Sequence, residues 1–257
     1  MEAGGGGVVV VTGASRGIGQ QVCISLLNAL PQLHIVAVAR SHTALEDNSE
    51  RLHIVQGDIS DPATQTAIRA KLHTLSQHPL LALINNAATL APTGALLDTS
   101  AAEWTQMLAT NLVAPLALSS ICMARLQQSR GRIINVTSSA SQAPVPGFSS
   151  YGMTKAALNY ATRALALEYP EVTSIAFYPG VVNTDMHHTV VHSAKTYAAA
   201  NPALDSSALL AKLAVPIPVD LPSAIIANLA LRADPSLSGR YVAYSDPEML
   251  AYHHYPN

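Results

Sequence analysis

The residues of this chain best suited to acid–base chemistry are a tyrosine and a lysine four positions apart, Tyr151 and Lys155. They open a run of good helix formers that continues to Glu168, so their side chains should share one face of a helix, about one turn apart. A lysine cation held beside a phenol favours the phenolate and lowers the pKa of the phenol from about 10. Such a tyrosine could donate a proton near neutral pH. The same spacing also occurs on solvated helix faces, so its interpretation depends on the elements around it.

A glycine-rich turn near the amino terminus predicts a phosphate-binding site. The β-branched run Val8–Thr12 is typical of a strand buried on both faces. It leads directly into Thr-Gly-Ala-Ser-Arg-Gly-Ile-Gly, residues 12–19, and then into a helical pattern that ends at Pro31. Glycines let the backbone approach a pyrophosphate, and the helix N-terminus offers free N–H groups and the positive end of its dipole. Strand, turn and helix in this order are the context that a dinucleotide site requires.

Two arginines indicate which dinucleotide would bind. The second predicted strand, residues 33–39, ends at Arg40 and Ser41, where an acidic residue would bind the ribose hydroxyls of NAD. Arg40 is instead cationic, and Arg16 in the glycine turn is a second cation. Two guanidinium groups near one ribose suit a 2′-phosphate, so the sequence favours NADP, supplied as NADPH. The alternative is a pair of solvated arginines at loop ends.

The next three predicted strands cover residues 52–56, 80–84 and 131–137. They are followed by Asp58 and Ile59, by Asn85-Asn86-Ala87-Ala88, and by Ser138-Ser139, respectively. The carboxyl ends of parallel strands are where ligands lie in open sheets. Asp58 could accept a hydrogen bond from an adenine amino group with Ile59 against the ring. Asp61 reads separately as a helix N-cap, because Pro62 follows it.

Strands and helices alternate along the whole chain. The pattern ends with predicted strands over residues 173–178 and 240–243 and a helix over residues 219–232. Residues 187–218 are irregular and read as a mobile helical flap. We find no internal boundary, repeat or low-complexity linker. The pattern therefore predicts an α/β fold in a single domain over residues 1–257, with a doubly wound, mostly parallel sheet and helices on both faces.

A long helix is predicted from Ser100, a plausible cap, to about Gln128, and it contains a proline. Pro115 cannot donate a hydrogen bond to the carbonyl four residues earlier, which belongs to Asn111. The sequence therefore predicts a local kink and an Asn111 oxygen that is free to hold water or a ligand. A break made for packing reasons alone is the alternative.

Composition excludes several classes of function. The net charge of −2 gives no electrostatic reason to expect nucleic acid or an anionic membrane as a partner. The amino terminus lacks the order of a signal peptide, and we see no apolar run approaching the ~18 residues of a membrane span. Two cysteines, Cys23 and Cys122, match no metal spacing and predict buried free thiols in a reducing, cytoplasmic setting. The ten histidines also predict no metal site; His187-His188 and His253-His254 read as surface residues.

Seven motifs together resemble the short-chain dehydrogenase/reductase family over essentially the whole chain. In the family's order and spacing they are Thr12-Gly-x-x-x-Gly17-x-Gly19, Asp58, Asn85-Asn-Ala, Asn111, Ser138, Tyr151-x-x-x-Lys155 and Pro179-Gly180-x-x-x-Thr184. One departure is Ala88, where the family usually has glycine. The C-terminal third looks most like fungal reductases akin to sepiapterin reductase and benzil reductase.

The resemblance implies a catalytic set of four residues. Tyr151 would give its proton to a substrate carbonyl, and Ser138 would hydrogen-bond the same oxygen. Lys155 would bind the nicotinamide ribose and lower the pKa of Tyr151, while Asn111 would hold a water that links Lys155 to solvent. The cofactor would contact Gly13, Ser15, Arg16, Gly17, Ile18, Gly19, Arg40, Ser41, Asp58, Ile59, Asn86, Ala87, Asn111, Tyr151, Lys155, Pro179, Gly180, Val182 and Thr184.

The expected substrate is a hydrophobic ketone or diketone, including aromatic ones, reduced with NADPH. Besides Ser138 and Tyr151, its pocket would be formed by the apolar residues Ala143, Pro144, Val145, Pro146, Phe148 and Met186. Pterin reduction is doubtful, because Ala243 stands where sepiapterin reductases have an acid, although Asp246 is close. Alternatives are an alcohol dehydrogenase acting oxidatively with NAD(P) and a non-catalytic NADP-binding scaffold. The family is usually a homodimer or homotetramer through its two long helices, here near residues 100–128 and 151–168.

Overall fold

A seven-stranded, all-parallel sheet forms the centre of the molecule. We describe a computed structural model of the chain, covering residues 6–41, 45, 50–203 and 205–254. The strands lie in the order β3-β2-β1-β4-β5-β6-β7. Their bounds are Val8–Thr12 (β1), His34–Ala39 (β2), Leu52–Gln56 (β3), Leu80–Asn85 (β4), Arg132–Val136 (β5), Thr173–Tyr178 (β6) and Tyr241–Ala243 (β7). The predicted doubly wound sheet is confirmed, and its order reverses between β1 and β4, the switch point where ligands bind in such folds.

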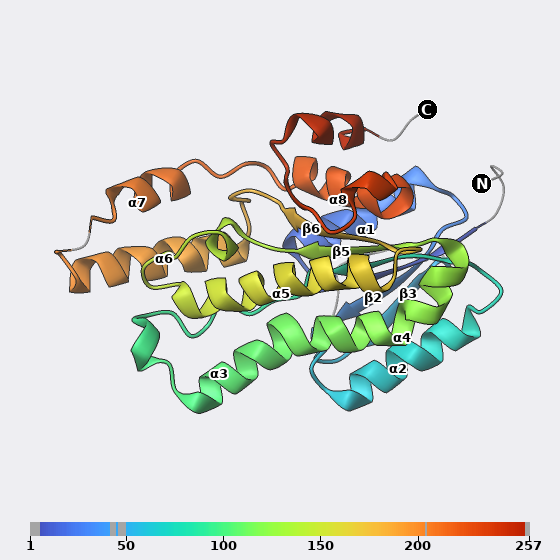
Figure 1. The fold of residues 1–257 in the computed structure, drawn as a ribbon, viewed down its shortest axis with the longest axis horizontal. Helices are drawn as coiled ribbons and strands as arrows, with labels where there is room; N and C mark the ends of the chain where they lie inside the picture. Colours follow the sequence, from blue (N-terminus) through green and yellow to red (C-terminus); the bar gives the residue numbers. More distant parts are fainter. Residues whose placement is uncertain (1–5, 42–44, 46–49, 204, 255–257) are drawn as a thin grey trace.

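Helices cover both faces of this sheet (Figure 1). Their bounds are Gly17–Ala29 (α1), Pro62–Thr74 (α2), Ala101–Leu108 (α3), Ala114–Ser129 (α4), Ser149–Glu168 (α5), Asp185–Ala200 (α6), Ser207–Leu213 (α7) and Asp220–Arg232 (α8). Helices α1 and α8 pack together on one face, and α2, α4 and α5 cover the other. The pair α6 and α7 projects beyond the sheet near the start of α5 (Figure 1).

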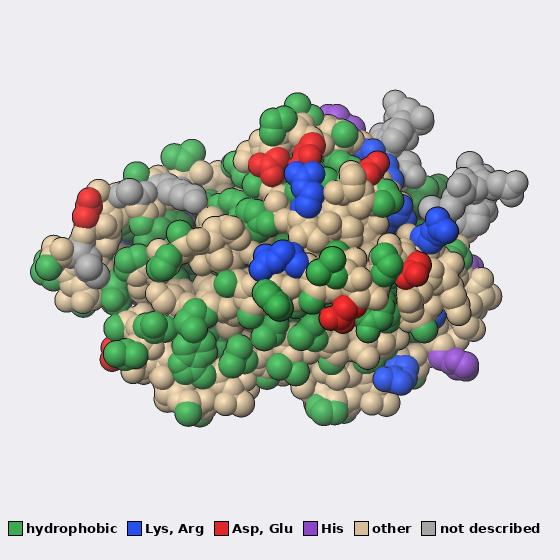
Figure 2. All heavy atoms as spheres, in the orientation of Figure 1, with side chains coloured by type: hydrophobic (Ala, Val, Ile, Leu, Met, Phe, Trp, Pro, Cys, Tyr) green, Lys and Arg blue, Asp and Glu red, His purple; other side chains and the backbone are tan. Residues whose placement is uncertain are grey.

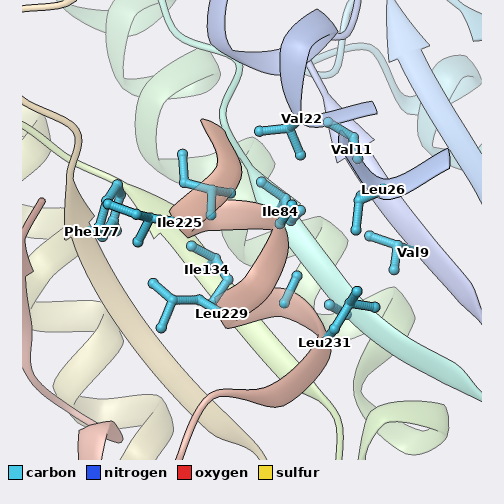
Figure 3. Close-up of a cluster of buried hydrophobic side chains, with 14 of the residues drawn as sticks. Val9, Val11, Val22, Leu26, Ile84, Ile134, Phe177, Ile225, Leu229 and Leu231 are labelled. Atoms are coloured by element: carbon cyan, nitrogen blue, oxygen red, sulfur yellow. The ribbon is translucent and has the colours of Figure 1, made fainter. Parts of the chain in front are cut away.

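The core consists of two apolar layers, one on each face of the sheet. Figure 3 shows the layer under α8, where Ile225 and Leu229 meet Phe177 and Ile134 from the central strands. The Val-rich run of β1 is fully buried on both faces, as a central parallel strand requires. Cys23 and Cys122 lie in these layers as free thiols, and burial raises the pKa of each to about 12.

Local signals in the sequence set several helix ends. Asp61 caps α2 by accepting a hydrogen bond from the Ala63 N–H at 2.8 Å, with Pro62 at the first helical position. Ser100 caps α3 in a capping box, in which Glu103 accepts a hydrogen bond from the Ser100 N–H at 2.9 Å. Both predicted caps are therefore confirmed.

The long helix predicted over residues 100–128 is interrupted where the sequence places a kink. Residues Ala109–Val113 form a π-helical turn between α3 and α4, and the Ala114 N–H donates to the Ala109 carbonyl, five residues back. By length and apolarity alone the stretch Ala101–Ser129 could span a membrane, which differs from our reading of the sequence. Half of its most apolar window is buried inside the protein, as in the core helix of a globular domain.

The predicted flap consists mainly of α6 and α7. The segment after α7 pairs with the segment before α6 through two backbone hydrogen bonds. The Ile217 N–H donates to the Val181 carbonyl at 2.8 Å, and the Asn183 N–H donates to the Ile217 carbonyl at 3.0 Å. Helix α6 begins at Asp185, two residues before the predicted start of the flap. The mobility of this segment stays a prediction.

One exposed face of the molecule carries many apolar side chains. Figure 2 shows hydrophobic side chains gathered over α3, α4 and α5. The large exposed residues on α5 are Met153, Tyr160 and Leu167, and Leu167 is 84% exposed. Val113 and Leu116 are also exposed, along the stretch from α3 to α4. A patch of this kind is typical of an association surface.

Candidate active site

A cleft with a cavity of about 590 Å³ runs along the carboxyl ends of the strands, from the glycine turn to the flap. Most of the predicted site residues line it. They are Gly13, Ser15, Arg16, Gly17, Ile18, Arg40, Ser41, Asp58, Ile59, Asn86, Ala87, Ser138, Val145, Phe148, Tyr151, Lys155, Pro179, Gly180, Val182, Thr184 and Met186. Residues from the whole length of the chain are thus brought to one cavity, as the fold predicts.

Five predicted site residues do not line the cleft. Ala143 is exposed in the loop before α5, and its neighbours Pro144 and Pro146 are exposed as well, so this part of the predicted substrate wall faces solvent. Gly19 and Asn111 are buried behind the cleft wall.

The glycine turn depends on glycine for two separate reasons. Gly13 and Gly17 have φ angles of +69° and +54°, in the left-handed region that other residues rarely adopt. A Cβ atom on Gly19 would lie 2.2 Å from the Gly13 carbonyl oxygen, so only glycine lets α1 approach the turn this closely. Thr12 then fixes the turn to the end of β4, because its Oγ1 accepts hydrogen bonds from the N–H groups of Asn86 and Ala87, both at 3.0 Å.

Asn111 connects the π-helical turn to the start of α5. Its side-chain amide pairs with the Thr89 backbone through two hydrogen bonds, from the Thr89 N–H at 2.8 Å and to the Thr89 carbonyl at 2.9 Å. The same amide nitrogen donates to Thr154 Oγ1 at 3.1 Å, one residue before Lys155. The side chain is fully buried. Asn111 therefore holds the loop after β4 against the helix that carries Tyr151 and Lys155.

The three central side chains meet at the middle of the cleft. The hydroxyls of Ser138 and Tyr151 both lie in the cleft, and the interaction with Ser138 acts to lower the pKa of Tyr151. The Lys155 ammonium lies 5.8 Å from the centre of the Tyr151 ring and donates to the Val136 carbonyl at 2.9 Å. Tyr151 and Lys155 are 9% and 2% exposed, so both ionisable groups are almost entirely removed from water.

Burial shifts the two pKa values in opposite directions. It raises the pKa of Tyr151 to about 12, a change that the hydrogen bond with Ser138 only partly opposes. It lowers the pKa of Lys155 to about 8. Loss of water therefore penalises the phenolate more than its surroundings stabilise it, and a lowering of the pKa of Tyr151 by Lys155 stays a prediction.

A buried polar chain supports α5 from below. The Asn85 amide donates to Asn135 Oδ1 at 2.8 Å, and the Asn135 amide donates to Thr162 Oγ1 at 2.9 Å. The chain runs from β4 through β5 to α5 and ends on the Leu158 carbonyl at 2.9 Å. Because each link is buried, loss of one member leaves its neighbours without partners. Sequence reasoning missed Asn135, because no motif distinguishes it from the other residues of its strand.

Two carboxylates face the arginines predicted to select the cofactor. Arg16 Nη1 lies 3.3 Å from Asp185 Oδ2, and both side chains are about two-thirds exposed. Arg40 Nη1 lies 4.0 Å from Asp58 Oδ2. Asp58 also accepts hydrogen bonds from the backbone N–H and hydroxyl of Ser60, at 2.9 and 2.7 Å. These hydrogen bonds and the Arg40 cation outweigh desolvation and hold the pKa of Asp58 below its usual value.

The substrate end of the cleft is largely apolar and includes residues that sequence reasoning missed. Besides Val145, Phe148 and Met186 it contains Leu90, Ala140, Val181, Val190, Leu209 and Leu213. His187 also lines this end. Its Nε2 contacts the Leu213 carbonyl at 2.9 Å and so joins α6 to α7, and its buried Nδ1 has no partner. The reading of His187 as a surface residue is therefore wrong, whereas His188 is exposed.

No group of three or more potential metal ligands is found among the described residues. Three histidines form a different kind of cluster, at the amino-terminal ends of β2 and β3 and in the loop before β4. His34 Nδ1 lies 3.1 Å from His53 Nε2, and the ring of His78 lies 4.4 Å from that of His34. The pKa values of His34 and His53 are lowered, first by burial and then by neighbouring positive charge.

Comparisons with known proteins show which family and which proteins this chain resembles. The family model described as short chain dehydrogenase matches residues 7–195. A benzil reductase ((S)-benzoin forming) of Saccharomyces cerevisiae is 28% identical over 259 residues, covering 95% of this chain and 98% of that protein. Sepiapterin reductase of Mus musculus is 32% identical over 215 residues, covering 76% and 82%. The structure of an NADPH-bound carbonyl reductase from chicken fatty liver is 26% identical with a TM-score of 0.72, covering 92% and 96%.

The match to the family model covers the glycine turn, the serine, the tyrosine–lysine pair and the first turns of the flap. The resemblance inferred from the seven motifs is confirmed, as is the likeness to benzil and sepiapterin reductases. This chain belongs to the short-chain dehydrogenase/reductase family.

Proposed function

We propose that the protein reduces a hydrophobic ketone or diketone to a hydroxy compound with NADPH. The observation that carries this proposal is the pair of interacting hydroxyls, Ser138 and Tyr151, that line the cleft together with Lys155. Two hydroxyls converging on one point can donate to a single carbonyl oxygen. The nearly charge-free wall beyond them suits an apolar substrate.

The glycine-turn end of the cleft fits a dinucleotide. A side chain at Gly13 would strain the backbone and meet Asn86 Nδ2 at 2.8 Å, so the turn keeps its surface open for a pyrophosphate. Arg16 and Arg40 line this end of the cleft as cations, which supports binding of a ribose 2′-phosphate there, and the resemblance of this chain to the family implies that Lys155 would bind the nicotinamide ribose. When bound, NADPH supplies the hydride. A reductase described as NADPH-bound is among the similar structures.

Tyr151 is suited to be the proton donor because it keeps its proton at neutral pH. A pKa of about 12 means that the phenol is protonated and can donate to a carbonyl oxygen. As that oxygen gains negative charge, Ser138 and Tyr151 stabilise it together. Lys155, whose pKa is about 8, stands beside Tyr151 as a cation that can replace the proton. We propose that the backbone carbonyl of Asn111 takes part in a proton path from Lys155 to solvent. Pro115 has no N–H and cannot donate a hydrogen bond to this carbonyl.

The apolar end of the cleft supports the proposed substrate class. Phe148, Val145 and Leu213 present no charge to a ligand. Asp246, the acid nearest to the predicted pterin anchor, does not line the cleft, because its carboxylate accepts a hydrogen bond from the Ala243 N–H at 2.8 Å. This favours aromatic ketones and diketones over pterins. The benzil reductase of Saccharomyces cerevisiae acts on a substrate of the favoured kind, as its name states.

We further propose that the protein acts as a homodimer or homotetramer in the cytoplasm. The apolar face over α4 and α5 supports self-association. Two free, buried thiols suit a reducing compartment. A structurally similar chain from Saccharomyces cerevisiae, with a TM-score of 0.77 and 26% identity, is described as a cytoplasmic protein.

The direct test uses purified protein, NADPH and a panel of aromatic diketones. Wild-type protein should oxidise NADPH in step with ketone loss, and Tyr151→Phe should lower kcat by about 10²–10⁴-fold while retaining NADPH binding. Equal turnover by the variant would refute the role of Tyr151. Binding of NADPH without turnover on any carbonyl would instead favour a non-catalytic scaffold.

A further inference from the structure

An ion pair crosses the mouth of the cleft and joins the cofactor end to the flap. Arg16 belongs to the glycine turn and stands immediately before α1, whereas Asp185 is the first residue of α6. Their side chains meet at 3.3 Å although they are 169 residues apart in the chain (residues 16 and 185). Both line the cleft. The guanidinium expected to bind a 2′-phosphate is therefore already in contact with a carboxylate of the flap.

We propose that Asp185 is a cofactor-selectivity residue that competes with the 2′-phosphate of NADPH for Arg16. This inference rests on the proposed use of NADPH. A phosphate and a carboxylate are alternative partners of one guanidinium, because both accept its planar N–H groups. Binding of the phosphate must weaken the pair with Asp185 and place two negative groups near one cation. NADH lacks this phosphate and leaves the pair intact.

The effect has a definite size and salt dependence. At 68% and 67% exposure, the two side chains form a solvent-screened ion pair, whose loss changes an equilibrium constant by about two- to fivefold. Asp185 should therefore reduce the preference for NADPH by that factor, and raising the ionic strength should diminish the effect. The pair Arg40–Asp58 is longer, at 4.0 Å, and its carboxylate is anchored by Ser60. Asp185 is thus the less constrained competitor of the two.

The test compares Asp185→Asn with Asp220→Asn in the full-length protein. Asp220 is also an exposed acid in the first turn of a helix, α8, so it controls for the loss of charge at a helix N-terminus. The dissociation constants of NADPH and NADH are measured by calorimetry at low and high salt. We expect Asp185→Asn to bind NADPH about two- to fivefold more tightly at low salt, with NADH binding unchanged. Asp220→Asn should change neither constant.

Two results would overturn the inference. An equal change in both dissociation constants would show that Asp185 acts through the flap as a whole, and no change in either would show that the pair does not compete. Arg16→Gln separates this inference from the proposed function. If that variant loses NADPH affinity while Asp185→Asn has no effect, only the competition is refuted. If wild-type protein prefers NADH and Arg16→Gln changes nothing, both the NADPH assignment and the competition are refuted.

Discussion

Replacing Lys155 with methionine should stabilise the protein while abolishing its proposed activity. Burial lowers the pKa of Lys155 from 10.5 to about 8, and one pKa unit corresponds to about 1.4 kcal/mol, so holding the cation in the folded protein at pH 7 costs about 3 kcal/mol. Methionine has a similar length and no charge. The substitution leaves the Val136 carbonyl without its 2.9 Å partner, which costs about 1 kcal/mol. We expect Lys155→Met to be about 2 kcal/mol more stable than wild type at pH 7.

The pH dependence gives this prediction its sign. Because the folded pKa lies below the unfolded one, the protonated lysine opposes folding at pH 7, and the penalty disappears as the pH rises from about 8 to above 10.5. Urea unfolding of both proteins at pH 7 and pH 10 measures the difference directly, because other groups that titrate in this range cancel. The advantage of Lys155→Met should fall to about zero at pH 10. A variant that is less stable than wild type at pH 7 would refute the reasoning.

Three further predictions test other parts of the molecule. Gly19→Ala should lower stability by about 1–3 kcal/mol and weaken NADPH binding, since its Cβ would lie 2.2 Å from the Gly13 oxygen; normal NADPH titration would contradict this. The lowered pKa values of His34 and His53 give stability that is present above about pH 6.5 and is lost as the pH falls, so His34→Gln should show a smaller fall in Tm between pH 7.5 and 5 than wild type. Leu167→Glu, at an 84% exposed position, should dissociate the oligomer in light-scattering chromatography, and a monomeric wild type would exclude that interface.

The sequence was most informative where local chemistry dictates backbone geometry. The glycine turn, the Asp61 cap and the break near Pro115 were all predicted because each depends on residues within a few positions. The parallel strands could be predicted equally well from the sequence, because short, continuous apolar runs of that length are typical of strands buried on both faces. The family motifs then located the cleft, because a parallel sheet brings the carboxyl ends of its strands to one edge.

The remaining features depend on contacts between distant segments. His187 was read as a surface residue because neighbouring histidines on a helix point apart, yet the carbonyl of Leu213 in α7 draws it into the cleft. Ala143 was placed in the pocket by its apolar neighbours, but the loop turns so that it is exposed. The Arg16–Asp185 pair could not be found from spacing at all. Each outcome is set by how the flap and loops pack, which no local pattern encodes.

The pKa values change how the tyrosine–lysine pair should be understood. The spacing of Tyr151 and Lys155 suggests a phenol that is already acidic, whereas burial in the protein alone raises its pKa to about 12 and lowers that of Lys155 to about 8. A phenol of this kind holds its proton until a carbonyl oxygen beside it becomes basic. Lysine near its pKa can then supply a proton at little free-energy cost. These pKa values support the proposal that Tyr151 stays protonated between turnovers and that Lys155 restores its proton.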